Sequence, residues 1–431
     1  MQRRTTATLL SALALSACGP HDLSSPVPNG PSPTANIARA PTPAPDFGLT
    51  WGLVEDVERP LDAFTIPSNL PTAPTGPGTA GHPGHFLGQS IIRDVAVGGD
   101  RLVAVGYTAF EGAWAADAWT STDGRHWVLS PIDARAGTFA EAIVALEDGS
   151  FAAVGRAGSD AVAWTSVDGR TWTRSTVGRL VIGASAGEPE RMATIATTPS
   201  GLVAGGSAGP ELGDRYARLW RSADGAAWTP ISDSEAFVGG EVVAIVAHPG
   251  GDGVAPGGLL ALGRLGTGQR ATGSVAWTST DGEAWLRSED PALAGGLVAA
   301  VVATPEGWLA VGSDADEREA VAWQSADGRA WTRAPGEPAR LHVGEKIRMT
   351  DVVVTAEGYV AIGNFVGVQF GEGTSWRSND GVTWVQAPIQ AALGQGEPEA
   401  VVAWRDRLVI VGSRGAPDDY IPSAWISPNV P

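Results

Sequence analysis

The stretch W-T-S-T-D-G-R-H-W at Trp119–Trp127 decides the fold, because close copies of it recur along the chain. It returns as W-T-S-V-D-G-R-T-W at Trp164–Trp172 and as W-R-S-A-D-G-A-A-W at Trp220–Trp228. Three further copies occupy Trp277–Trp285, Trp323–Trp331 and Trp376–Trp384. Successive copies of W-x-S-x-D-G-x-x-W begin 45 to 57 residues apart, and a repeat of this length is typical of a propeller or a solenoid.

Two apolar segments precede each copy, as in V-V-A-T-P-E-G-W-L-A-V-G ending at Gly312 and V-V-A-W-R-D-R-L-V-I-V-G ending at Gly412. Short runs of Val, Ala, Ile and Leu bounded by Gly and polar turns indicate buried strands. Together with the two segments that flank each Asp-Gly pair, they give four strands per unit. The sequence therefore predicts an all-β protein, a seven-bladed β-propeller of four-stranded blades.

The Asp-Gly pair at the centre of each copy predicts a hairpin turn. A two-residue hairpin loop needs positive φ at its central positions, which Asp tolerates and Gly adopts freely. If Asp-Gly forms such a loop, the first and last Trp of a copy lie on opposite faces of the hairpin. Each blade would then present one indole to each neighbouring blade, and the Ser before Asp would bond backbone groups of the turn.

Closure of the ring is predicted from the two ends of the chain. The last copy, Ala424-Trp-Ile-Ser-Pro-Asn429, stops short and has Asn where the others have Asp. The missing half is found in Asp46-Phe-Gly-Leu-Thr-Trp51, which resembles Asp168–Trp172. We therefore expect Phe47–Val57 to supply the outer strand of the last blade, which leaves no open sheet edge.

The repeated copies resemble the Asp-box, or BNR, repeat of sialidases and many other secreted propellers, although the family pattern has one more residue between Asp and Gly. The resemblance covers residues 46–431. It implies that each box lies on the turn between the third and fourth strands, away from the ligand face. The box aspartates are then structural and not catalytic: Asp123, Asp168, Asp224, Asp281, Asp327 and Asp380.

The first residues resemble a bacterial lipoprotein signal. Arg3 and Arg4 precede an apolar stretch, Ala7–Ala17, that is too short to span a bilayer. Leu15-Ser-Ala-Cys-Gly19 resembles the lipobox, which implies that Cys18, the only cysteine, carries a lipid and becomes the mature N-terminus. The alternative is an ordinary signal with an incidental cysteine, and the export route stays open.

We divide the chain accordingly into a signal peptide with lipobox (1–18), a Pro-rich tether (19–45) and the propeller (46–431), with a loop insertion at about 58–89. The tether has no apolar period, so we expect it to be disordered and to reach roughly 80 Å at most. We expect the protein to be located at the extracytoplasmic face of a bacterial membrane and to contact that membrane only through its lipid anchor.

Composition excludes several functions. The 29 basic and 47 acidic residues give a net charge of −18, and this field repels nucleic acid and anionic lipid surfaces. A single cysteine excludes an intramolecular disulfide and a cysteine-based zinc site. We expect a monomer without a cofactor.

The candidate ligand site is the end of the channel where the first strand of each blade opens. Charged residues open most of these strands, whereas the fifth blade opens with Gly295-Gly-Leu297 and should make the mouth lopsided. Variable loops add Trp114 and Tyr420 to this face. The alternative reading is a set of solvated strand ends. The charged residues are Arg93, Asp94, Glu141, Glu190, Arg191, Glu241, Arg348, Asp351, Glu397 and Glu399.

Evidence for metal binding is weak. Asp314, Asp316, Glu317 and Glu319 alternate as calcium ligands do, but a solvated loop explains them better. His82-Pro-Gly-His85 has no further ligand nearby in the sequence. We therefore predict no metal site.

Catalysis is tested against the sialidase resemblance. That family uses three arginines, a tyrosine nucleophile activated by Glu and an Asp acid/base, with the first arginine in an aromatic-Arg-Ile-Pro motif. Phe64-Thr-Ile-Pro67 has Thr at the arginine position, Asp419-Tyr-Ile-Pro422 also lacks it, and no Tyr-Glu pair can be assigned. Arg93, Arg191 and Arg348 remain as another possible cluster.

The leading hypothesis is a non-enzymatic propeller that binds a protein or glycan partner in the cell envelope. The alternative is a carbohydrate-active enzyme, a glycoside hydrolase or lyase, at the cell surface. A third hypothesis, an assembly factor for a membrane complex, rests on fold analogy alone.

Overall fold

The computed structural model describes residues 49–58, 89–110, 113–179, 188–209, 215–231, 235–248, 250, 258–267, 270–335, 346–366, 371–388, 392–394, 396–415 and 420–428. The predictions for Cys18, the tether, Phe64–Pro67, His82 and His85 fall outside these residues. Within the described part of the chain, no helix has the length and apolar character needed to cross a membrane.

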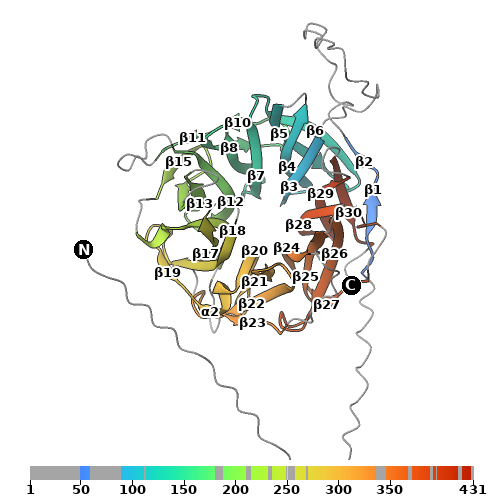
Figure 1. Ribbon diagram of the computed structural model, residues 1–431. Coiled ribbons are helices and arrows are strands. Elements are labelled where there is room, and N and C mark those ends of the chain that lie inside the picture. The colour runs from blue at the N-terminus through green and yellow to red at the C-terminus, as the bar shows by residue number, and fades with distance from the viewer. Residues whose placement is uncertain are drawn as a thin grey trace, which may run out of the picture. The chain divides into compact units, whose positions relative to one another are not determined.

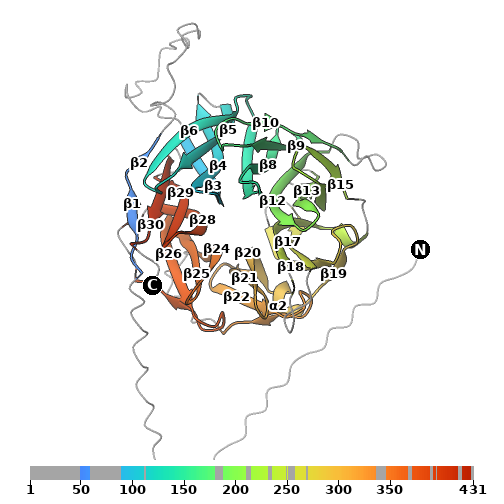
Figure 2. The same cartoon turned by 180° about the vertical axis from the view of Figure 1, so that it is seen from behind.

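Seven sheets form a ring, which confirms the predicted seven-bladed β-propeller, and the four main strands of each blade pair antiparallel (Figures 1 and 2). Each innermost strand contacts the innermost strands of both neighbouring blades. Strands are given from the inside outward.

Blade 1 contains β3 (Gln89–Gly98), β4 (Arg101–Phe110), β5 (Ala113–Ser121) and β6 (His126–Asp133). Blade 2 contains β7 (Thr138–Ala145), β8 (Phe151–Ala157), β9 (Asp160–Ser166) and β10 (Thr173–Arg174). Blade 3 contains β12 (Glu190–Thr198), β13 (Gly201–Ala208), β14 (Tyr216–Ser222) and β15 (Ala227–Pro230). Blade 4 contains β16 (Gly240–His248), β17 (Gly258–Thr267), β18 (Arg270–Ser279) and β19 (Leu286–Ser288).

Blade 5 contains β20 (Gly296–Thr304), β21 (Gly307–Asp314), β22 (Ala320–Ser325) and β23 (Thr332–Arg333). Blade 6 contains β24 (Lys346–Thr355), β25 (Gly358–Val366), β26 (Gly371–Ser378) and β27 (Val385–Gln386). Blade 7 contains β28 (Gly396–Trp404), β29 (Arg407–Arg414), β30 (Ile421–Ile426) and β1 (Gly52–Val54). Two short helices, η2 (Glu235–Phe237) and α2 (Pro291–Ala294), connect strands.

The N-terminal segment closes the ring as predicted. Strand β1 pairs antiparallel with β30 and completes blade 7. The next strand, β2 (Asp56–Val57), leaves blade 7 and pairs in parallel with β6 of blade 1. The same arrangement occurs between blades 2 and 3, where β11 (Thr176–Val177) follows the last strand of blade 2 and pairs in parallel with β15, the outer strand of blade 3. The N-terminal segment therefore behaves as the missing second half of a repeat.

The box turn is longer than the predicted two-residue loop. In blade 1, four residues separate β5 from β6, and only Gly124 takes a positive φ, of 69°. Ser121 Oγ accepts the N–H of Gly124 at 2.9 Å, and Asp123 Oδ1 accepts the N–H groups of Arg125 and His126 at 2.7 and 2.8 Å. Because the Asp side chain closes the turn by accepting these bonds, its backbone need not enter the left-handed region.

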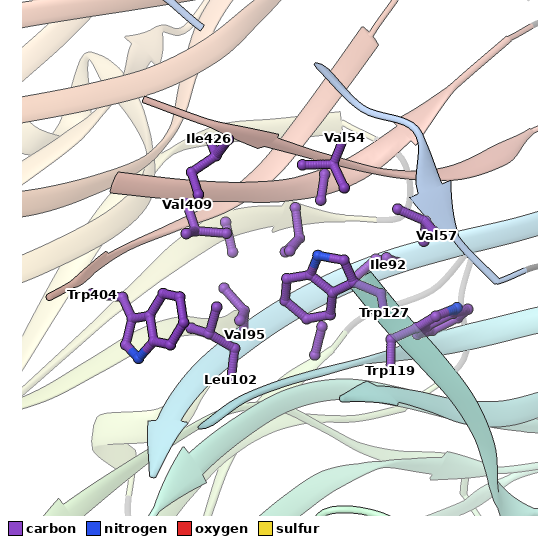
Figure 3. Packing of buried hydrophobic residues seen from close by; sticks show 14 of the residues in the cluster. Val54, Val57, Ile92, Val95, Leu102, Trp119, Trp127, Trp404, Val409 and Ile426 are labelled. Carbon is purple, nitrogen blue, oxygen red and sulfur yellow. The ribbon is translucent and has the colours of Figure 1, made fainter. Parts of the chain in front are cut away.

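The placement of the two box tryptophans is therefore also corrected. The longer turn pairs Trp119 with Leu129, and Trp127 lies two residues before Leu129, so all three share one face. A two-residue loop would have shifted the register by one residue and turned Trp127 to the other face. Both indoles are buried in one cluster against Trp404, Val409 and Ile426 of blade 7 (Figure 3). Each blade thus packs both box tryptophans toward the preceding blade.

Candidate functional site

Every innermost strand contains a β-bulge near its start, where the pairing with the second strand skips one residue. A bulge redirects the side chain of the extra residue. All seven bulge residues line one cavity of about 370 Å³ on the propeller axis, here called the axial cavity. They are Arg93, Glu141, Ala193, Val243, Ala299, Thr350 and Glu399.

A glycine in the second strand of each blade makes room for the bulge. Gly106 pairs with Ile92, the residue just before the Arg93 bulge. A Cβ on Gly106 would lie 2.0 Å from the carbonyl oxygen of Ile91, and the equivalent distances in the other six blades run from 1.9 to 2.5 Å. The glycine is therefore required by close backbone approach. The sequence shows it as the Gly that ends each second apolar run, as at Gly312.

Six of the predicted residues meet in the axial cavity. They are Arg93, Glu141, Arg191, Glu241, Arg348 and Glu399. Asp94, Asp351, Trp114 and Tyr420 are not among its lining residues, and sequence reasoning missed Thr350 and Arg264. Arg264 directly follows the glycine of β17 and pairs with Glu241 across the sheet. A lone Arg in the run L-L-A-L-G-R-L was the sequence feature that could have revealed it.

The wall from blades 7, 1 and 2 holds an arginine between two glutamates. Arg93 Nε lies 3.3 Å from Glu141 Oε2, and Arg93 Nη1 lies 2.8 Å from Glu399 Oε2. The charge of Glu399, together with that of Glu141, outweighs burial and raises the pKa of Arg93 above its usual range. This wall carries two carboxylates for one guanidinium.

The wall from blades 4 to 6 is basic. Arg264 Nε donates to the carbonyl oxygen of Val298 at 2.9 Å, and no carboxylate among the described residues lies within 4.0 Å of its guanidinium. Burial lowers the pKa of Arg264, and the nearby charge of Arg348 lowers it further. Arg348 Nε donates to Asn364 Oδ1 at 3.2 Å, and its Nη1 is 4.0 Å from Glu317 Oε1.

Arg191 shares a carboxylate with Arg215 on this side of the ring. It pairs with Glu241, which also accepts a bond from Arg215 Nη1 at 2.7 Å. Arg191 therefore has an ion-pair partner in the cavity, whereas Arg264 has none among the described residues.

Asp94 and Asp351, predicted as ligand-binding residues of the channel mouth, do not line the axial cavity, and neither is a freely solvated strand end. Each is half-buried. Asp94 accepts the N–H groups of Val95 and, in the next blade, Ile143, both at 2.8 Å. Asp351 likewise accepts those of Val352 and Val401 at 2.8 Å. These carboxylates connect neighbouring blades.

Burial raises the pKa of Asp94 to about 6 and that of Asp351 to about 7. The backbone hydrogen bonds act in the opposite direction but are outweighed. Both groups therefore titrate near neutral pH.

The two predicted aromatic residues, Trp114 and Tyr420, do not line the axial cavity. Trp114 is half-buried and packs edge-on against Tyr107, with ring centroids 5.2 Å apart, and near Phe139. Tyr420 donates its hydroxyl hydrogen to Glu397 Oε1 at 3.4 Å. The remaining strand-opening residue, Glu190, is buried beside Arg179, whose Nε lies 3.5 Å from Glu190 Oε2.

The acidic loop 313–319 uses its side chains within the protein. Asp314 Oδ1 accepts the N–H groups of Arg318 and Glu319, while Glu317 pairs with Lys346 and Glu319 with Arg333. Across the described ranges, no group of three or more His, Cys, Asp or Glu side chains is arranged to hold a metal ion.

The fold and site define a seven-bladed β-propeller with a mixed-charge cavity at the strand-opening end of its axis. No protein-family model and no curated protein sequence matches the chain. Solved structures similar to it include a protein of unknown function from Dyadobacter fermentans, with 15% identity, a TM-score of 0.47, and coverage of 79% of this chain and 94% of that one.

Two further similar structures have named activities. Trypanosoma rangeli sialidase in complex with sialic acid shows 12% identity and a TM-score of 0.45, and the match covers 79% of this chain and 54% of the sialidase. A glycosyl hydrolase from Bacteroides ovatus shows 11% identity and a TM-score of 0.37, with coverage of 79% and 84%. The present chain thus spans about half of the sialidase.

Proposed function

We propose that this chain is a non-enzymatic binding protein, lipid-anchored at the extracytoplasmic face of a bacterial membrane, whose propeller holds a protein or glycan partner of the cell envelope. One observation carries the proposal: six charged residues predicted from separate strand openings converge on one cavity at one end of the axis. The box turns lie at the other end, because the third strand of each blade runs away from this opening.

The box end offers no comparable variety. In all six boxes the Gly N–H donates to the Ser hydroxyl, at 2.8 to 2.9 Å. The box Asp side chain is engaged with its own loop, as Asp123 and Asp168 illustrate. A repeated structural turn needs such uniformity, whereas a recognition surface needs differences between blades.

The electrostatics of Tyr107 support a non-enzymatic role. Tyr107 lies close enough to Arg93, Glu141 and Glu399 to feel their charges. Burial raises the pKa of Tyr107 to about 12, so its phenol stays protonated at neutral pH. A nucleophile needs the opposite shift.

The same neighbourhood favours the second candidate, a carbohydrate-active enzyme, because it places one tyrosine beside two glutamates and an arginine. Turnover of a glycoside by the protein would favour the enzyme over the non-enzymatic binding protein. A Tyr107→Phe variant that lost this turnover while still folding would place the chemistry at Tyr107.

Capture of envelope components tests the proposed function. The mature chain and an Arg348→Ala, Glu141→Ala variant would be used to capture labelled envelope proteins and glycans. We expect the variant to lose at least tenfold in capture, and an Arg125→Ala, Arg170→Ala variant at the box end to bind normally. Asp351 is left unchanged because it holds blade 7. Normal capture by the first variant, with loss in the second, would place the site at the box end.

The anchor is tested separately. Cys18→Ala should abolish lipid labelling and release the protein from the membrane fraction, whereas Ser24→Ala in the predicted tether should change neither. Unchanged partitioning of the Cys18→Ala protein into detergent would contradict the anchor.

A further inference from the structure

The axial cavity is electrically two-sided. Its acidic wall comprises Glu141 and Glu399, which share Arg93, and its basic wall comprises Arg264 and Arg348. Blades 7, 1 and 2 are consecutive in the ring. Blade 4, which carries Arg264, lies across the axis from blade 1, whereas blade 6, which carries Arg348, adjoins blade 7 through β24 and β28 (Figure 1). Arg264 therefore faces the two glutamates across the cavity, and Arg348 comes from the blade next to that of Glu399.

The two glutamates of the acidic wall can still bind a second cationic group. Each glutamate uses one carboxylate oxygen on Arg93, and no second cation among the described residues lies within 4.0 Å of either. Both side chains remain partly exposed, at 16% and 18%. Among the described residues, one of the two negative charges therefore has no ion-pair partner, and one oxygen of each glutamate is left to accept hydrogen bonds.

The basic wall has an excess of positive charge. Arg264 has no ion pair among the described residues, and its Nε bond to Val298 leaves the two terminal nitrogens as donors. Glu317, the carboxylate near Arg348, is shared with Lys346. Burial and the nearby charge of Arg348 disfavour the charged state of Arg264, so an anion placed here would stabilise the charged guanidinium.

Between the walls the cavity is lined by small apolar side chains. Ala193, Val243 and Ala299 occupy the bulge positions of blades 3 to 5, where the other blades carry longer or polar residues. Their size leaves the volume of about 370 Å³ open, which corresponds to roughly twelve water molecules at about 30 Å³ each. This space suits a compact organic molecule.

We propose that the axial cavity binds a small zwitterion, a free amino acid or short peptide, with its ammonium group on Glu141 and Glu399 and its carboxylate on Arg264 and Arg348. A simple anion would leave the surplus carboxylate unpaired, and a simple cation would leave Arg264 unpaired. A partly buried charge that loses water to a ligand without gaining a partner is costly. This goes beyond the proposed function, because a macromolecule can bind the rim without filling the cavity.

The test is calorimetric titration of the mature chain with alanyl-alanine, its N-acetylated form and its C-terminal amide. We expect the free dipeptide to bind, and each blocked form to bind at least tenfold more weakly. N-acetyl-alanyl-alanine binding as tightly as the free form would show an anion site only. The amide binding as tightly would show a cation site only. Either result, or no heat from any of the three at millimolar concentration, overturns the proposal.

Variants assign the two walls. Glu399→Gln should remove the preference for the free over the acetylated form, and Arg264→Gln should remove the preference for the free form over the amide. Arg348→Gln provides a second basic-wall variant if Arg264→Gln fails to fold, and Arg329→Gln at the box end is the matched control. Equal weakening of all three ligands by Glu399→Gln would contradict the assignment. The capture assay uses envelope proteins and glycans, whereas the titration uses dipeptides. A failure of the proposed function can therefore be distinguished from a failure of the zwitterion site.

Discussion

The N-terminal segment should hold the ring closed chiefly through Trp51, and Trp51→Ala tests this. The indole is buried in the cluster between blades 6 and 7, against Val401, Ile410 and Trp425. Its Nε1 also donates to Ser375 Oγ of blade 6 at 3.2 Å. The substitution therefore removes the contact that joins the added outer strand of blade 7 to the preceding blade.

The expected loss follows from the size of the cavity that would remain. A buried Trp→Ala change costs about 3–5 kcal/mol when the surroundings cannot collapse. The cluster is built from strands of two sheets fixed by their own ladders, so little collapse is available. Loss of the bond to the buried Ser375 adds about 1 kcal/mol. We expect the free energy of unfolding to fall by about 4 kcal/mol.

Urea denaturation followed by circular dichroism measures this change. Thr50→Ala is the matched control, because Thr50 is the exposed neighbour in the same segment, and its effect should stay within about 0.5 kcal/mol. Removal of residues 1–58 should be more damaging still, since β1, β2 and the bond from Trp119 Nε1 to the Glu58 carbonyl are lost together. If Trp51→Ala unfolds within 1 kcal/mol of the unmodified chain, the segment does not close the ring.

Three further outcomes are expected. Gly312→Ala should destabilise the protein by about 1–3 kcal/mol, because the new Cβ would lie 2.0 Å from the Leu297 carbonyl oxygen. Gly295→Ala is the control, because a Cβ there has no neighbour within 4 Å. Equal stability of the two variants would refute the steric role of Gly312. The unfolding free energy should fall as pH rises from about 4 to about 7, because Asp94 and Asp351 bind protons more tightly when folded than the unfolded chain does, at about 3.9. Asp351→Asn should make the unfolding free energy depend less on pH. The loss of stability between about pH 4 and about pH 7 should shrink by up to about 4 kcal/mol, at about 1.4 kcal/mol per unit of pKa shift. An unchanged pH dependence in urea titrations would contradict the raised pKa of Asp351. A fluorogenic sialoside should not be hydrolysed, since Thr65 stands where the sialidase motif has Arg, and robust release of the fluorophore would reverse that prediction.

The repeat predicted the blades because its cues are local. An apolar run ending in Gly, followed by a Trp-bounded Asp-Gly turn, specifies two hairpins wherever it occurs. The half-repeat at Trp51 predicted the closing strand for the same reason. The box turn is one residue longer than the sequence predicts, because its length depends on which backbone N–H groups the Asp123 carboxylate accepts. That single step reversed the face of Trp127.

The strand openings were recognised from the sequence as a charged ring, and six of those residues do meet. What each one does there was decided by non-local geometry. Asp94 connects to Ile143 and Asp351 to Val401 across blade boundaries, contacts between residues about fifty positions apart that no local pattern encodes.

The sequence alone determined the number of blades, because the repeats can be counted, and the four strands of each blade, because they follow from a pattern within one repeat. The resemblance to the Asp-box repeat implied which end of the axis carries the boxes. Tertiary structure decided which side chains enter the axial cavity and which of their charges stay uncompensated. A bulge aims a side chain inward only once its strand lies against the glycine of the next strand. The walls formed by Glu399 and Arg264 come from blades whose separation across the axis exists only after the ring has closed.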